Sequence, residues 1–314
     1  MALTYSSDGD PADWAAPRRR TFSIQSRGRA AELAALEFGD PKQPIDVLFL
    51  NANGFNALTY RSALAPLGDR LRILAVDQQG HGLSPQRSVP AGRTDWLDLR
   101  DDLLALLETL GGGPLVLAGH SMGGAVSVLA AAERPDRVRA LALFDPVIIS
   151  REARAASREA GADNQLALGA DRRRAVFPDR DTVFSSYRGR GAFRTWPDRA
   201  LLDYITDGFR DRADGAVELA CAPQWEASGF RAHGHDLWSV MPRIFAPVRI
   251  LRAEHASTCH LEKPEAFNPG AADVTVRTVP GTSHFLPIER PDLVRETLLE
   301  VVGATGSSPG SPTR

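Results

Sequence analysis

The chain has 314 residues, of which 43% are hydrophobic and 24% are charged, and its formal net charge is −2. This is the composition of an ordinary globular protein, and the near-neutral charge argues against nucleic acid or an anionic membrane surface as a partner. No apolar run reaches the length of a membrane span, and the two cysteines are too few for a disulfide framework. We therefore expect a cytoplasmic protein with reduced thiols that acts on a small molecule, as either a monomer or a homodimer.

The first half of the chain alternates predicted strands and helices. Residues 1–20 are polar and form a predicted flexible arm. The predicted elements that follow are strands at Thr21–Gln25, Glu32–Phe38, Ile45–Leu50, Leu71–Val76, Leu115–Ala118 and Val138–Phe144, a helix through Tyr60 and Leu67, a helix capped by Thr94 that stops at Gly111, and a helix that continues from Ala125. The first two strands form an antiparallel ribbon, and the later alternation predicts an α/β fold with a mostly parallel twisted sheet and helices on both faces.

The alternation stops after Asp145. Residues 148–239 contain no convincing buried strand but many aromatic residues, which predicts a helical cap inserted after the strand that ends at Asp145. The predicted core is therefore 21–147 together with 240–302, with strands at Val248–Leu251 and Asp273–Val279 and a helix at Pro291–Val302. Residues 303–314 form a predicted disordered tail. The arginine clusters at 18–20 and 172–174 lie near acidic residues and are expected on the solvated surface.

One stretch combines a buried strand, a serine between glycines and a helix of small residues. Gly119-His120-Ser121-Met122-Gly123 fits G-x-S-x-G, directly after the apolar run Leu115–Ala118. A serine on a sharp strand-to-helix turn presents its hydroxyl above the sheet, and the glycines are needed because side chains there would collide with the helix and the neighbouring strand. The helix N-terminus directs free N–H groups at the same point, which favours a developing oxyanion. Ser121 is therefore the candidate nucleophile.

A serine nucleophile needs a base, and His284 is the candidate. It lies in Val279-Pro280-Gly281-Thr282-Ser283-His284, the loop after the last predicted strand, which leads into the terminal helix. The other histidines lie in glycine turns, in the cap or after the Val248–Leu251 strand.

These motifs resemble the α/β-hydrolase fold, in its capped esterase-like branch, over residues 21–302. The match rests on Gly119–Gly124, on Asp77-Gln78-Gln79-Gly80-His81-Gly82-Leu83-Ser84, and on Gly281–His284, taken in this order and spacing. The resemblance implies Ser121 as nucleophile, His284 as base, and an oxyanion hole made by the backbone N–H groups of Met122 and Phe55, with no cofactor and no metal.

The chain departs from the family at two positions. Where relatives have His-Gly, it has Asn53-Gly54, which alters the bonds that hold the loop. Most relatives place the triad acid after the strand before the last one, but the turn at 252–258 contains no aspartate. Part of the family takes the acid from the position directly before the cap, which is Asp145 here. We favour Asp145 over the rival acid Glu254.

The predicted function is hydrolysis of a small, largely apolar ester or lactone by a Ser-His-Asp triad. The substrate-binding residues that we expect are Asn53, His120, Tyr187, Trp196 and Trp225. Ser121 argues against relatives that attack with aspartate, such as haloalkane dehalogenases and epoxide hydrolases. Carbon–carbon bond hydrolysis on the same triad and a non-catalytic ligand receptor remain the alternatives. Metal binding by His233 with His235, or by His255, Cys259 and His260, lacks a matching ligand set.

Overall fold

The computed structural model describes residues 14–86, 92–153, 155, 164–232, 234–267 and 273–306. Most of the predicted N-terminal arm, residues 307–314 of the predicted tail, and His233 lie outside these residues. No helix in the described part of the chain is long and apolar enough to cross a membrane.

Within the described residues, eight strands form one sheet in the order β1-β2-β4-β3-β5-β6-β10-β11. The pairings β1/β2 and β2/β4 are antiparallel, and all the others are parallel. The strands are β1 (Arg18–Ser26), β2 (Arg29–Phe38), β3 (Val47–Leu50), β4 (Ile73–Val76), β5 (Leu115–His120), β6 (Val138–Phe144), β10 (Val248–Ala253) and β11 (Val274–Val279). The predicted antiparallel ribbon and mostly parallel sheet are confirmed.

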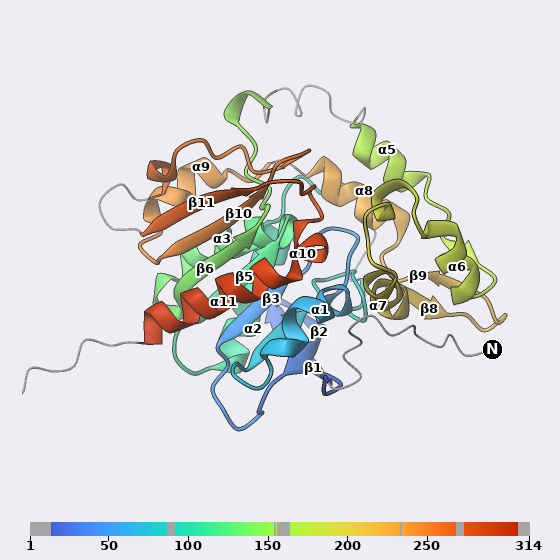
Figure 1. Cartoon of the computed structure of the whole chain (residues 1–314), viewed down its shortest axis with the longest axis horizontal. Helices are drawn as coiled ribbons and strands as arrows, with labels where there is room; N and C mark the ends of the chain where they lie inside the picture. Colours follow the sequence, from blue (N-terminus) through green and yellow to red (C-terminus); the bar gives the residue numbers. More distant parts are fainter. Residues whose placement is uncertain are drawn as a thin grey trace, which may run out of the picture.

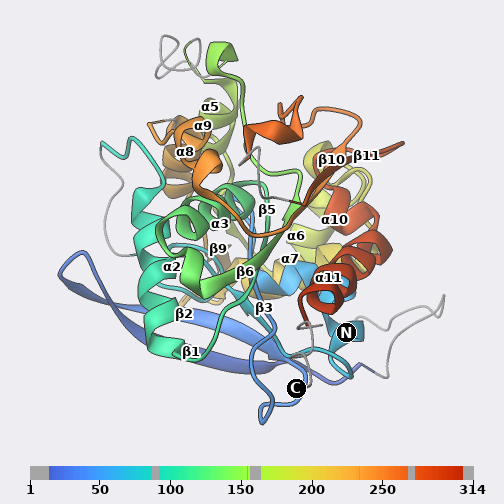
Figure 2. The same ribbon diagram turned by 90° about the vertical axis from the view of Figure 1, so that its left-hand side faces the viewer.

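Helices cover both faces of this sheet, as predicted. Figure 2 shows α2 and α3 on one side of the strands and α11 on the other. The helices are α1 (Arg61–Leu64), α2 (Leu97–Leu110), α3 (Met122–Glu133), α5 (Gln165–Asp171), α6 (Arg180–Tyr187), α7 (Asp198–Gly208), α8 (Pro223–Arg231), α9 (Leu237–Val240), α10 (Leu286–Glu289) and α11 (Pro291–Gly306). Short 3-10 turns are η1 (Ala57–Tyr60), η2 (Ala65–Leu67), η3 (Pro135–Arg137), η5 (Gly191–Phe193), η6 (Met241–Arg243) and η7 (Pro264–Ala266).

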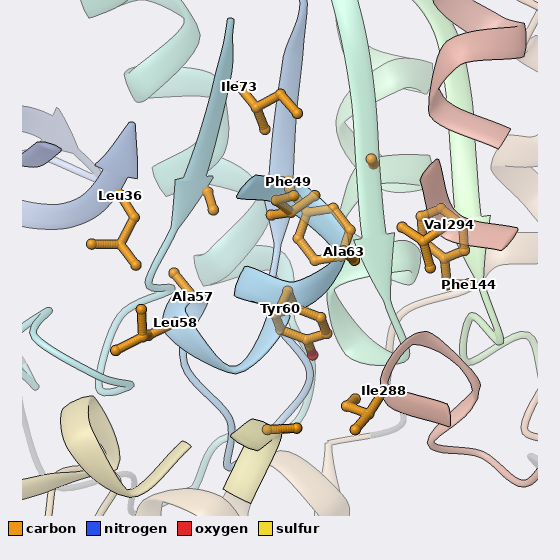
Figure 3. Close-up of a cluster of buried hydrophobic side chains, with 14 of the residues drawn as sticks. Leu36, Phe49, Ala57, Leu58, Tyr60, Ala63, Ile73, Phe144, Ile288 and Val294 are labelled. Carbon is orange, nitrogen blue, oxygen red and sulfur yellow. The ribbon is translucent and has the colours of Figure 1, made fainter. Parts of the chain in front are cut away.

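The apolar side chains separate into two large clusters because successive strand residues point to opposite faces of the sheet. Phe49 belongs to one cluster, while its neighbours Leu48 and Leu50 belong to the other. Figure 3 shows part of the Phe49 cluster, in which Tyr60 lies with its hydroxyl oxygen directed away from Phe49. Since both faces are covered, the central strands are apolar throughout rather than alternating.

Within residues 148–239, which we propose as the cap, the part from α5 to α8 lies beside the sheet (Figure 1), whereas α9 packs against α3. The prediction that the cap holds no buried strand is wrong, because β7 (Val176–Phe177), β8 (Phe209–Asp211) and β9 (Val217–Leu219) form a small antiparallel sheet. Strands of two or three residues are too short to show an alternating pattern. The buried residues Phe177, Tyr204 and Phe209 belong to the same apolar cluster as Phe49, so the cap packs against the core through a shared interior.

Several predicted boundaries are wrong, among them those of β1, α11 and α2. Strand β1 already begins at Arg18, because Arg18 and Arg20 pair with Glu37 of β2. Helix α11 continues to Gly306, four residues past the predicted end. Helix α2 begins at Leu97, whose N–H donates to the Asp95 carboxylate at 3.0 Å, so Thr94 is not its cap.

Candidate active site

The candidate nucleophile lies on a strained turn between β5 and α3. Ser121 has φ 54° and ψ −117°, and it follows directly on the end of β5 and precedes the first residue of α3. A Cβ atom at Gly119 would collide with the backbone of Gly123, and one at Gly123 would collide with the carbonyl oxygen of Leu50. The predicted strand, turn and helix are therefore all present, and the two glycines are needed for the predicted steric reason.

His284 lies between Ser121 and Asp145. Its Nε2 is 3.0 Å from the Ser121 hydroxyl oxygen, and its Nδ1 is 2.6 Å from an Asp145 carboxylate oxygen. Ser121 follows β5, Asp145 follows β6, and His284 lies in the loop after β11, so the three meet at the carboxyl ends of the parallel strands. This is the edge of an open α/β sheet where ligands bind. The structure thus brings together residues that are 139 and 163 positions apart in the chain.

Asp145 is fully buried, and backbone and hydroxyl groups surround its carboxylate. One oxygen accepts hydrogen bonds from the Ala253 N–H at 2.9 Å and the Ser257 hydroxyl at 2.5 Å. The other accepts from the Thr258 N–H at 3.1 Å and faces His284. Burial acts to raise the pKa of Asp145, but the hydrogen bonds and the His284 charge outweigh it and lower the pKa below its usual value. The carboxylate is therefore held ionised beside the imidazole.

Glu254, the rival acid, lies in a different setting. Its carboxylate accepts from the Gly281 N–H at 2.8 Å and lies 3.3 Å from His255, and its side chain is 45% exposed. No hydrogen bond or ion pair within the described residues joins it to His284. The structure therefore places Asp145, and not Glu254, next to the candidate base.

The second predicted oxyanion donor, the Phe55 N–H, lies in the loop after β3 and is already hydrogen-bonded there. The Phe55 N–H donates to the Ala52 carbonyl at 3.1 Å, so it is committed within the loop. The Asn53 N–H has no hydrogen-bond acceptor among the described residues. A Cβ at Gly123 would collide with the backbone oxygens of Leu50 and Asn51, so this loop packs on the first turn of α3. Met122, as the first residue of α3, has a backbone N–H without an intrahelical acceptor.

Two of the expected substrate-binding residues make contacts within the protein. The Asn53 side chain donates to the Glu226 carbonyl at 2.9 Å and lies 3.3 Å from the His81 ring. His120 is fully buried and is hydrogen-bonded through both ring nitrogens.

The three expected cap aromatics lie at different places. The Trp196 ring contacts those of Phe55 and Phe285 at centroid distances of 5.3 and 5.7 Å, and the Phe285 ring lies 5.9 Å from that of His284. Tyr187 stacks on Phe193, which contacts Trp196, so Tyr187 lies two rings further from the histidine than Trp196. Phe55, Trp196 and Phe285 thus form an aromatic wall beside the candidate base. The sequence analysis missed Phe285, although its position directly after His284 was an available signal.

Trp225 packs away from this wall. Its indole N–H donates to the Gln79 carbonyl at 3.0 Å, and a Cβ at Gly80 would collide with its ring. The guanidinium of Arg93 lies 4.6 Å from its ring centroid. Nothing in these contacts directs Trp225 toward Ser121, and its role in substrate binding stays a prediction.

Arg173 is not on the solvated surface, where we expected it. Its guanidinium donates to the Glu226 carboxylate at 2.5 Å and to the Tyr204 hydroxyl at 3.0 Å. Since sequence alone does not show which acid a distant arginine meets, this partly buried pair could not be predicted. Among the described residues, no group of three or more His, Cys, Asp or Glu side chains is arranged to hold a metal ion.

Comparison with known proteins agrees with this fold. The model of the alpha/beta hydrolase family matches residues 47–297. The 2-(acetamidomethylene)succinate hydrolase of Mesorhizobium japonicum is 28% identical over 263 residues, which cover 82% of this chain and 88% of that protein. The crystal structure of an E-2-(acetamidomethylene)succinate hydrolase matches with a TM-score of 0.70 and 25% identity, covering 91% of this chain and 100% of its own. The enol-lactonase from Burkholderia xenovorans is similar in fold, with a TM-score of 0.63, 20% identity, and coverage of 90% and 99%.

Proposed function

The chain belongs to the alpha/beta hydrolase family, and from this premise we propose that it is a serine hydrolase of a small, largely apolar carboxylic ester or lactone. The observation that carries the proposal is the continuous set of contacts from Ser121 through His284 to Asp145. A serine hydroxyl is a weak nucleophile until a base takes its proton, and His284 is within hydrogen-bond reach of it.

In the proposed mechanism, Ser121 attacks the carbonyl carbon while His284 Nε2 takes the hydroxyl proton. Asp145 holds the proton of His284 on Nδ1, so that Nε2 is free to accept, and its charge stabilises the imidazolium. The imidazolium then protonates the leaving alcohol, and the acyl group stays on Ser121. A water molecule that gives a proton to His284 hydrolyses this acyl-enzyme and restores the serine.

The developing oxyanion requires two N–H donors, and we place them at Met122 and Asn53. Met122 is at the N-terminus of α3, where the helix dipole also favours negative charge. Asn53 replaces Phe55 in this role because the Phe55 N–H already donates to the Ala52 carbonyl. The side chain of Phe55 contributes instead to the aromatic wall.

The preference for an apolar acyl group rests on that wall of Phe55, Trp196 and Phe285. Arg173 does not oppose this preference, because Glu226 already neutralises its charge. A carboxylate-bearing substrate would have to displace that pairing to gain a cationic partner here.

Hydrolysis of another acyl bond on the same triad is the second candidate. It is favoured by the substrate named for the Mesorhizobium relative, an acetamido compound. Carbon–carbon bond cleavage uses the same residues and belongs to this group of alternatives.

The test uses purified wild-type protein and Ser121→Ala. We expect p-nitrophenyl acetate, butyrate and octanoate to be hydrolysed by the wild type only, and a fluorophosphonate probe to label the wild type only. Labelling without ester turnover would move the proposal to amide or diketone substrates. Failure of both, in a folded protein, would refute a serine hydrolase and favour a ligand receptor.

A further inference from the structure

His120 comes directly before Ser121, yet the proposed mechanism does not use it. The residue is fully buried, and each ring nitrogen has one partner. Its Nδ1 lies 2.9 Å from the Tyr60 hydroxyl oxygen, and its Nε2 lies 2.7 Å from the backbone carbonyl oxygen of His284. The Tyr60 hydroxyl also accepts a hydrogen bond from the Ala52 N–H at 3.0 Å.

The position of every proton in this set follows from what each end can do. A backbone N–H only donates, so the Tyr60 oxygen accepts from Ala52, and in a neutral ring that carries its proton on Nε2 the bare Nδ1 of His120 accepts the Tyr60 hydrogen. A backbone carbonyl only accepts, so His120 Nε2 carries the proton that bonds to His284. His120 is therefore the neutral Nε2–H tautomer, and Tyr60 selects that tautomer.

Neutrality matters because the His120 ring lies 4.9 Å from the His284 ring. Burial, with the charge of His284 as a further cause, lowers the pKa of His120 to about 3. When His284 becomes an imidazolium, His120 therefore adds no second positive charge and does not compete for the proton. The Asp145 carboxylate is left to stabilise a single cation.

The bonds connect four segments that meet around the proposed site. Ala52 is next to Asn53 in the loop after β3, Tyr60 is the last residue of η1, and His120 ends β5. His284 lies in the loop after β11. All hydrogen bonds in this series point in one direction, from Ala52 to His284, so each bond polarises the next. The apolar side chains around Tyr60 (Figure 3) keep water from competing for its hydroxyl.

We propose that Tyr60 and His120 are positioning residues, which form a hydrogen-bonded relay that holds the loop of the base and the oxyanion loop in register around Ser121. This inference rests on the proposed function. Neither residue touches the reacting atoms. A small displacement of the base is enough to reduce the rate of a proton transfer. Tyr60→Phe keeps its ring and leaves the aromatic wall in place, whereas the His120 ring lies 5.8 Å from that of Phe55, so its replacement also changes this contact.

The kinetic test uses variants that remove one bond each. Tyr60→Phe keeps the ring, which packs 4.7 Å from that of Phe49, and removes the hydroxyl. His120→Asn places an amide near the Nδ1 position and loses the donor to His284, whereas His120→Gln places one near the Nε2 position and retains it. Thr297→Val is the matched control, because it removes a buried hydroxyl that bonds to the Leu293 carbonyl in α11.

We expect Tyr60→Phe and His120→Asn to lower kcat by about tenfold to a hundredfold, with KM changed by less than about twofold in Tyr60→Phe. His120→Gln should recover at least part of the loss relative to His120→Asn, and Thr297→Val should leave kcat unchanged. A purely packing role would instead lower thermal stability in all four variants without this division of kcat from KM. Wild-type kcat in both Tyr60→Phe and His120→Asn would overturn the proposal.

A spectroscopic measurement separates this inference from the proposed function and does not require the variants to be active. Long-range proton–nitrogen correlation spectra of histidine-labelled protein report which ring nitrogen carries the proton, with His120→Asn used for assignment. We expect wild-type His120 as the neutral Nε2–H tautomer at neutral pH. A proton on Nδ1, or a charged ring, would contradict the relay. If the wild type shows the expected tautomer but neither hydrolyses esters nor reacts with the probe, the proposed function fails and the arrangement of protons stands.

Discussion

Replacing Asp145 by asparagine isolates the contribution of one negative charge to the proposed reaction. In the structure, the carboxylate is 2.6 Å from His284 Nδ1, so the charge centres of carboxylate and imidazolium lie about 4 Å apart. At an effective dielectric constant of about 20, two unit charges at that separation attract by about 4 kcal/mol. Since each 1.36 kcal/mol changes a rate about tenfold, Asp145→Asn should lower kcat by about a thousandfold.

The surrounding hydrogen bonds decide how the new amide sits. Its NH2 group can occupy the position that faces the Ser257 hydroxyl, which is able to accept, while its oxygen keeps the bonds from Thr258 N–H and His284 Nδ1. This orientation leaves one donor–donor contact, with the Ala253 N–H. The opposite orientation would also force the His284 proton onto Nε2, which then could not accept from Ser121. The first orientation is favoured, so the expected loss is that of the charge.

The assay compares kcat for p-nitrophenyl butyrate in wild type, Asp145→Asn and Glu254→Gln, with Ser121→Ala as the background. Glu254→Gln is the matched control, because Glu254 contacts Gly281 and His255 rather than the base, and it should stay within about twofold of wild type. The reasoning fails if Asp145→Asn keeps more than about a tenth of wild-type kcat, or if Glu254→Gln is the crippling change.

Three further predictions concern the pocket and the fold. Trp196→Leu replaces a large ring of the aromatic wall by a smaller side chain and leaves space for a longer acyl chain. The ratio of kcat/KM for octanoate over acetate should therefore rise by roughly tenfold in a steady-state assay. Burial raises the pKa of Asp77 to about 7. The folded state therefore binds this proton more tightly than the unfolded state, so this carboxyl's contribution to stability is lost as pH rises from about 4 to about 7. In urea unfolding, the free energy of unfolding of Asp77→Asn relative to that of the wild type should rise by roughly 4 kcal/mol between pH 4 and pH 7. In the same urea measurement, Gly123→Ala should lower the free energy of unfolding by at least about 2 kcal/mol, because its Cβ would collide with the Leu50 carbonyl. Gly169 faces open space, so Gly169→Ala should raise the free energy of unfolding slightly.

The sequence was sufficient for the sheet and for the serine turn because both depend on local patterns. An apolar strand, a serine between glycines and a helix of small residues admit few arrangements, and the collisions found at Gly119 and Gly123 show why the glycines are required. His284 was identifiable from its place after the last strand. These features depend on residues that are neighbours in the chain or on the order of elements, and a single sequence displays both.

What the sequence could not show are contacts between distant residues. The turn that commits the Phe55 N–H to the Ala52 carbonyl is a local exception, because Asn53-Gly54 at its centre was an available signal for a turn that the sequence analysis did not use. The pairing of Arg173 with Glu226 joins residues 53 positions apart, and the relay of Tyr60 and His120 joins residues 60 positions apart. Such contacts depend on how the elements pack together, which a pattern within one element does not contain.

The choice between Asp145 and Glu254 illustrates how strand order resolves what sequence leaves open. Strand β10 lies between β6 and β11, so an acid at the end of either β6 or β10 starts from a position close to the loop of His284. In this chain the turn after β10 has no aspartate, and its residues serve the neighbouring acid instead. The Ala253 N–H, the Ser257 hydroxyl and the Thr258 N–H all donate to the Asp145 carboxylate. The turn in which most relatives carry the acid thus supplies hydrogen-bond donors to an acid on the adjacent strand. Its own carboxylate, Glu254, is not needed beside His284 and faces solvent.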